Sequence, residues 1–131
     1  MIQSLNGLRA PTERVKHTLT DYVHRVTTRY PQDVLSITLY GSQARGDAHP
    51  ESDIDLFLVV QPYFTETLRE AFHDLAWQVQ FKHDVVISDI IRSQEEAHQM
   101  QAQGFPYYQN IEKEGIVLWK KTASKPTPVF A

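Results

Sequence analysis

Three aspartates, Asp53, Asp55 and Asp84, have the types and spacing that could support chemistry. Residues two apart on a strand point to the same face, so we expect Asp53 and Asp55 to project together, with Asp84 beside them on a strand about 4.8 Å away. Such carboxylates repel one another, and no Lys or Arg lies between Arg45 and Arg69 to neutralise them. Oxygen ligands without His or Cys suit a hard cation such as Mg²⁺, whose coordination sphere is completed by waters and substrate phosphates. These residues predict a magnesium site that handles a nucleotide.

Gly41 and Ser42 begin a segment, GSQARG, that could form the phosphate side of such a site. A glycine at a strand end lets the backbone turn sharply and approach a ligand, and the following amides and hydroxyl can receive phosphate oxygens. Arg45 can add positive charge. The two glycines have P-loop spacing, but Asp47 stands where that motif needs Lys and no Ser or Thr follows. A calcium loop starting at Asp53 is excluded because apolar residues occupy its later ligand positions.

Hydrophobic periodicity predicts the elements that position these residues. Apolar residues at three- and four-residue spacing indicate amphipathic helices, and a Ser-x-x-Glu capping box opens a third helix that a glycine ends. Runs rich in β-branched and large apolar residues indicate buried strands. The predicted helices span 12–30, 65–80, 93–104 and 107–112, and the predicted strands span 34–40, 53–60, 83–88 and 116–119.

The connections between the strands determine the topology. A crossover helix does not fit between Gly41 and Asp53, so the first two strands are predicted to be antiparallel. A helix fits between Val60 and His83, which predicts a parallel pair joined by a right-handed crossover. The fold class is therefore α/β with a small mixed sheet flanked by helices. In this arrangement the end of the first strand and the beginnings of the next two meet at one edge of the sheet, where the glycine turn and the aspartates converge.

The length and composition limit the remaining possibilities. A chain of 131 residues has room for one domain, expected over 1–120, with a flexible tail over 121–131. A net charge of −3 argues against direct nucleic-acid binding through phosphate neutralisation. Without cysteine there is no disulfide or thiol nucleophile. The sequence shows neither a long apolar run nor the apolar core of a signal peptide, so we expect no membrane span and a cytoplasmic location.

The motif GS-x10-DxD, formed by Gly41, Ser42, Asp53 and Asp55, resembles that of the DNA polymerase β-like nucleotidyltransferase superfamily. With Asp84 in an apolar run further on, the chain most resembles its minimal nucleotidyltransferase (MNT) group. The resemblance implies a nucleotidyltransferase fold and a two-metal-ion Mg²⁺ site that uses ATP as substrate.

The resemblance also implies roles for individual residues. The DxD aspartates, Asp53 and Asp55, would hold the metal ions, and a third carboxylate on the next strand would complete the catalytic site. Asp84 is preferred to Asp89 for that role because it begins the predicted strand. The Gly-Ser turn, with Arg45 one turn on, would bind the nucleotide triphosphate.

MNT proteins are commonly antitoxin partners of HEPN-domain RNase toxins, and some transfer AMP to a tyrosine of the toxin. The resemblance therefore implies a protein adenylyltransferase with a HEPN toxin as its partner. Two alternatives stay open: a small-molecule nucleotidyltransferase similar to aminoglycoside-modifying enzymes, and an inactive antitoxin that acts by binding alone. Trp77, Tyr107, Tyr108 and Trp119 are expected in the core or on a partner surface rather than as base-stacking residues.

Overall fold

The structure is a computed structural model, and it describes residues 8, 11–49 and 52–122. One four-stranded mixed sheet with strand order β3-β2-β1-β4 forms its centre. As predicted, β1 pairs antiparallel with β2, and β2 pairs parallel with β3. β4 pairs antiparallel with the other edge of β1. In chain order the elements are α1 (Glu13–Arg29), β1 (Val34–Tyr40), α2 (Ser42–Arg45), β2 (Ile54–Val60), α3 (Glu66–His83), β3 (Ile87–Ser93), α4 (Gln94–Ala102), α5 (Pro106–Glu114) and β4 (Ile116–Lys120).

The helices begin where local capping chemistry predicts. The Thr12 side chain accepts a hydrogen bond from the Val15 amide at the start of α1. Ser93 and Glu96 form the predicted capping box of α4, with reciprocal bonds of 2.9 and 3.1 Å. Pro106 occupies the first turn of α5. These caps confirm the predicted helix starts.

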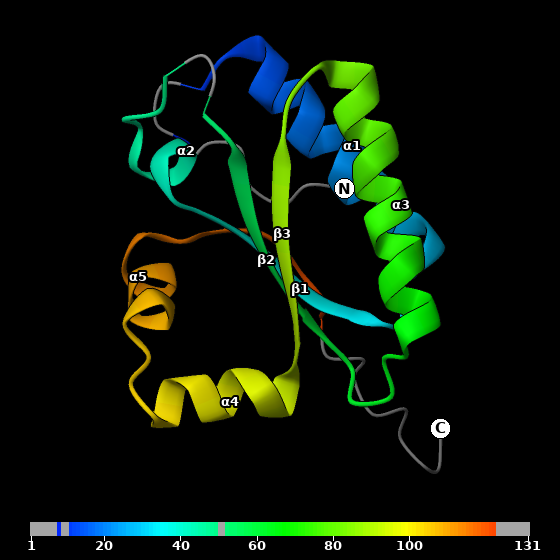
Figure 1. The fold of residues 1–131 in the computed structure, drawn as a ribbon, viewed down its shortest axis with the longest axis vertical. Coiled ribbons are helices and arrows are strands. Elements are labelled where there is room, and N and C mark those ends of the chain that lie inside the picture. The colour runs from blue at the N-terminus through cyan, green and yellow to red at the C-terminus, as the bar shows by residue number, and fades with distance from the viewer. Residues whose placement is uncertain (1–7, 9–10, 50–51, 123–131) are drawn as a thin grey trace, which may run out of the picture.

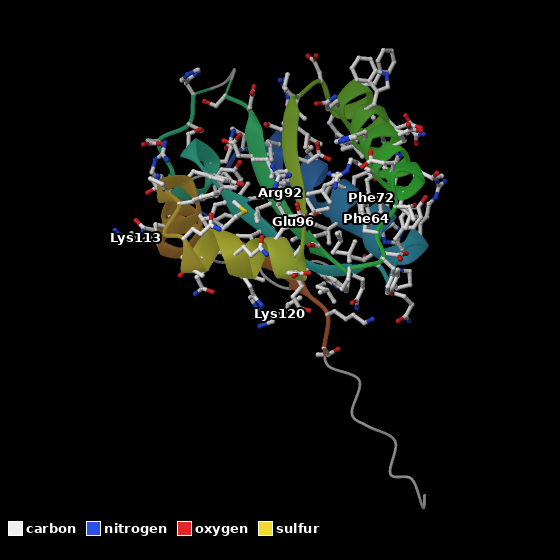
Figure 2. All side chains as sticks on the ribbon, turned by 60° about the horizontal axis from the view of Figure 1, so that its bottom comes forward. Phe64, Phe72, Arg92, Glu96, Lys113 and Lys120 are labelled. Carbon is white, nitrogen blue, oxygen red and sulfur yellow. The ribbon has the colours of Figure 1, made fainter. Side chains whose placement is uncertain are left out.

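Helices cover both faces of the sheet (Figure 1), which explains why β2 is apolar on both sides. α1 and α3 pack on one face over the main core, which includes the fully buried Leu19, Leu56 and Phe72. Figure 2 shows Phe64 beside Phe72, with ring centroids 4.9 Å apart. α4 and α5 pack on the other face around Phe57. The α/β fold with a small mixed sheet is confirmed.

The third strand differs from the prediction. Instead of a strand over 83–88, α3 continues to His83, and β3 begins at Ile87. Asp84 caps the helix with φ 54° and ψ 50°, a left-handed conformation, and its amide donates to the Gln80 carbonyl. The prediction that Asp84 begins a strand is therefore wrong. The helix extends because its last turn is held by tertiary contacts: His83 Nε2 lies 2.8 Å from Asp21 Oδ2 on α1.

The elements that carry the candidate site meet at one end of the molecule. In Figure 1, α2, the first residues of β2 and β3, and the last turn of α3 lie together at the top. No helix within the described residues is long and apolar enough to span a membrane. The predicted tail over 121–131 lies almost entirely outside the described residues.

Candidate active site

The turn after β1 is built around Gly41. Its backbone has φ 75° and ψ −157°, a conformation that is essentially restricted to glycine. The Gly41 carbonyl accepts hydrogen bonds of 3.0 Å from the amides of Ala44 and Arg45, which closes the short helix α2. A Cβ atom at Gly41 would collide with the carboxylate oxygen Oδ2 of Asp55. Glycine is therefore needed here both for the turn and for the close approach of Asp55.

Asp53 and Asp55 come together at the start of β2, as the sequence predicts. Asp53 is exposed directly before the strand, and Asp55 is half-buried opposite Tyr40 in the β1–β2 ladder. Burial raises the pKa of Asp55, the negative charge of Asp53 raises it further, and the nearby Arg45 guanidinium opposes both. The pair therefore carries the mutual repulsion that a bound cation would relieve.

Tyr40 is a member of this site that sequence reasoning missed. Burial raises its pKa to about 12, and the charge of Asp55 adds to the effect. The phenol thus stays protonated at neutral pH and is a potential hydrogen-bond donor beside the carboxylate. Its place immediately before the Gly-Ser turn was the available signal. Strand pairing was needed to show that it faces Asp55.

Arg45 lies at the mouth of the site but already has partners. Its Nε lies 3.1 Å from Asp47 Oδ2, and its Nη1 lies 3.1 Å from Glu114 Oε1 on α5. The hydrogen bond to Asp47 raises the pKa of the guanidinium, desolvation opposes it, and the negative charges of Asp47 and Glu114 add to the rise. The side chain is exposed, so it can reach a phosphate only by sharing or exchanging these partners.

The structure does not gather a third carboxylate with the pair. Across the described residues, no group of three or more His, Asp or Glu side chains is arranged to hold a metal ion. The parallel register places Ser88 beside Asp55. Asp84 is exposed in the turn that precedes this strand, at the same end of the sheet. The predicted convergence of three carboxylates is therefore limited to two.

Asp89 is separated from the site by the sheet itself. It pairs with Leu56, so its side chain lies on the opposite face from Asp55, under α1 and α3. Its carboxylate is 3.5 Å from His73 Nδ1, and burial raises its pKa despite that partner. Asp89 is thus not an alternative third carboxylate.

The donor set fits a magnesium ion. Asp53 and Asp55 offer carboxylate oxygens at the start of one strand, and Mg²⁺ usually takes one or two carboxylates together with waters and substrate phosphates. Ser42 directly follows the Gly41 turn as the first residue of α2. A cavity of about 340 Å³ lies nearby, but Gln43, Ser52 and Ile54 line it while none of Gly41, Ser42, Asp53 and Asp55 does, so it is not the site itself. The carboxylate pair and the glycine turn, rather than this cavity, could hold a metal ion and a nucleotide.

A glycine turn from a strand into a short helix, set against a DxD pair on the neighbouring antiparallel strand, defines a nucleotidyltransferase-type site. The chain belongs to the nucleotidyltransferase domain family, whose model matches residues 20–118. It is thus an enzyme of the minimal nucleotidyltransferase type.

Known proteins resemble this chain in sequence and in fold. The Methanocaldococcus jannaschii protein named "Putative protein adenylyltransferase MJ0604" is 31% identical over 101 residues, which cover 77% of this chain and 94% of that protein. A structure described as a "putative minimal nucleotidyltransferase" aligns with TM-score 0.55 and 15% identity over 79% of this chain and 92% of that one. A toxin–antitoxin structure with AMP-PNP aligns with TM-score 0.52 and 19% identity over 76% of this chain and 71% of that one. At these identities the two structures show a shared fold.

Proposed function

We propose that this nucleotidyltransferase depends on Mg²⁺, moves AMP from ATP to a tyrosine hydroxyl of a partner HEPN RNase toxin, and acts as its antitoxin. The observation that carries the proposal is the contact between the Gly41 turn and Asp55, with Asp53 beside it. The turn suits a triphosphate and the carboxylate pair suits a divalent cation. The name of the archaeal relative supports a protein acceptor. The toxin–antitoxin structure with AMP-PNP supports a toxin partner and an adenine nucleotide.

The proposed reaction gives the site residues roles in binding the metal ion or the nucleotide. Asp53 and Asp55 would hold the magnesium ions, whereas Asp84 would stay outside the metal site, as a third negative charge in the neighbouring turn. Gly41 and Ser42 bind the triphosphate through backbone amides and the Ser42 hydroxyl, and Arg45 adds charge at the mouth of the site. When bound, Mg²⁺ neutralises the charge that develops on the transferred phosphoryl group.

The reaction is a substitution at the α-phosphorus of ATP. The acceptor hydroxyl oxygen forms a bond to that phosphorus, the bond to the oxygen bridging to the β-phosphate breaks, and pyrophosphate leaves. The hydroxyl proton is lost to solvent. The product carries AMP as a phosphodiester. Its added negative charge and bulk would repel RNA from the toxin, so one transfer could silence it.

A macromolecular acceptor fits the exposure of the site. Asp53 and Arg45 are both exposed, so a large partner can approach the candidate active site. The net charge of −3 makes RNA a poor acceptor. A protein hydroxyl is therefore preferred to a small alcohol or an RNA end. The cytoplasmic location expected from the sequence stays a prediction.

The test is coexpression with a HEPN-domain RNase toxin, followed by intact-mass analysis of the toxin. We expect AMP increments with the wild-type protein, and a loss of transfer on the order of 10³-fold with Asp53→Asn. Asp33→Asn, the same change at the start of β1, is the matched control and should transfer normally. If Asp53→Asn neutralises the toxin fully and the toxin carries no added mass, the protein acts by binding alone. Transfer to small alcohols in place of the toxin would favour the small-molecule alternative.

A further inference from the structure

Three large apolar side chains are exposed together where α3 ends and β3 begins. The exposed fractions are 68% for Trp77, 86% for Phe81 and 56% for Val86. Trp77 and Phe81 are four residues apart on α3 and therefore neighbours on one helix face. With Gln80 and Asp84 these side chains line a shallow groove of about 440 Å³. We call Trp77, Phe81 and Val86 the apolar surface.

The apolar surface adjoins the candidate active site. The Ile54 amide donates a 2.9 Å hydrogen bond to the Val86 carbonyl, and Ile54 lies between the two aspartates of the DxD pair. The last turn of α3 and the starts of β2 and β3 lie at the same end of the molecule (Figure 1). Because α3 packs on the face of the sheet opposite Asp55, a protein seated on the apolar surface would reach over this end of the sheet to approach Asp53 and Asp55.

Acidic side chains flank the apolar surface. Glu70 and Asp74 precede Trp77 on the same helix face, and Asp84 follows Phe81 at the end of the helix. All three are exposed, and none forms an ion pair with another residue in the described part of the chain. The nearby Lys82 is turned toward α1, where its Nζ lies 3.8 Å from Asp21.

This charge distribution selects the kind of partner. A second copy of the chain in a two-fold contact would bring identical acidic flanks together, which is electrostatically unfavourable. A segment that carries apolar side chains on one face and Lys or Arg around them would bury the aromatics and compensate the carboxylates. An amphipathic basic helix presents this pattern at the spacing of Trp77 and Phe81.

We infer that the apolar surface is the docking site for the acceptor protein, which binds it through a basic amphipathic helix and so brings its hydroxyl to the DxD pair. This inference rests on the proposed protein-adenylyltransferase function, because that function supplies the need for a protein acceptor. Trp77 and Phe81 would be the anchoring residues, and Glu70 and Asp74 would guide the encounter.

Binding can be measured without any chemistry. The chain has two tryptophans, so Trp119→Phe leaves Trp77 as the single fluorophore. The probes are synthetic helical peptides of Leu and Lys, with a Leu–Glu peptide and a Ser–Lys peptide of the same length as controls. We expect only the Leu–Lys peptide to shift the Trp77 emission to the blue and to protect it from acrylamide. Peptide anisotropy with the unsubstituted protein measures the same binding independently of the Trp119 change.

Variants then link binding to transfer. Phe81→Ser should raise the KM for the HEPN acceptor at least about tenfold, with ATP affinity unchanged. Asp74→Lys should lower the affinity of the protein for the Leu–Lys peptide and make that affinity less dependent on salt concentration. Tyr63→Ala is the matched control, since Tyr63 is 60% exposed at the other end of α3 and should change neither quantity.

Several outcomes would overturn the inference. Equal binding of the Leu–Lys and Leu–Glu peptides would refute the charge argument, and an unchanged acceptor KM in folded Phe81→Ser would refute docking. Sedimentation showing a dimer that Phe81→Ser dissociates would assign the surface to a second copy. Failure of the proposed function is distinguishable: the toxin would bind and Phe81→Ser would weaken that binding, yet no AMP would be transferred.

Discussion

Gly41→Ala is the substitution that most directly tests the geometry of the site. The backbone at φ 75° and ψ −157° lies in a region that costs an alanine about 1–3 kcal/mol. The new Cβ would also collide with the Asp55 carboxylate. Relieving such overpacking costs a further ~1–3 kcal/mol. The total of about 2–6 kcal/mol is large beside a typical domain stability of about 5–15 kcal/mol, so we expect a folded but weakened protein.

A matched control separates the collision from the backbone cost. Gly104 also has a positive φ, 67°, but a Cβ there would meet only the Gln109 Nε2 at 3.6 Å, an ordinary contact. Gly104→Ala should therefore cost about 1–2 kcal/mol, the usual left-handed penalty. Asp55→Ala removes the obstructing oxygen, so in that background Gly41→Ala should become less costly by the collision energy.

The assay is urea unfolding at equilibrium, read as a shift in midpoint at constant m-value, for the single variants and the double variant. ATP affinity of the folded fraction is measured in parallel, and we expect it to fall for Gly41→Ala and to be unchanged for Gly104→Ala. The contact between the turn and the carboxylate is refuted if Gly41→Ala lowers the free energy of unfolding no more than Gly104→Ala does, and if the double-mutant cycle of Gly41→Ala with Asp55→Ala shows no coupling energy.

Five further substitutions test other parts of the structure. Asp84→Gly should raise the free energy of unfolding by up to about 1 kcal/mol, measured in urea, because a glycine adopts φ 54° without strain. Burial raises the pKa of Asp89 above its ordinary value of 3.8, so the folded protein loses stability as the pH rises above that ordinary value and the buried carboxyl becomes charged. Asp89→Asn should therefore increase the free energy of unfolding at pH 7, and this gain should vanish on acidification. Tyr22→Phe removes the buried hydroxyl that interacts with the Asp89 carboxylate and should cost about 1–3 kcal/mol in thermal melts, whereas Phe72→Ala should cost about 3–5 kcal/mol. Ser93→Ala should cost about 1 kcal/mol in urea unfolding by removing the α4 cap.

Local signals were sufficient wherever the chain itself determines the structure. The strand predicted over 34–40 has those bounds, because a proline turn precedes it and Gly41 ends it. The contact between the glycine turn and Asp55 was also predictable, since a short connection permits only antiparallel pairing. The capping box at Ser93 was predictable because both of its partners, Ser93 and Glu96, lie within one helical turn.

Long-range contacts account for what the sequence could not reveal. Val85 and Val86 favour a strand locally, but the helix before them persists because His83 reaches Asp21 on α1. The ion pair of Arg45 joins residues that are 69 positions apart. No periodicity of a single segment encodes such pairs, so both the end of α3 and the orientation of Arg45 required the three-dimensional structure.

The position of Asp84 connects the parts of the proposed mechanism. It is the one residue other than glycine with a positive φ in the described chain, and a glycine would adopt that conformation at lower cost. Backbone strain of this kind persists where the surroundings impose it, and it concentrates at functional sites. The strained turn joins the helix that carries Trp77 and Phe81 to the strand that runs beside the DxD pair. A carboxylate retained there, at a cost in stability, is what we expect if its charge is used by the reaction or by the acceptor that docks beside it.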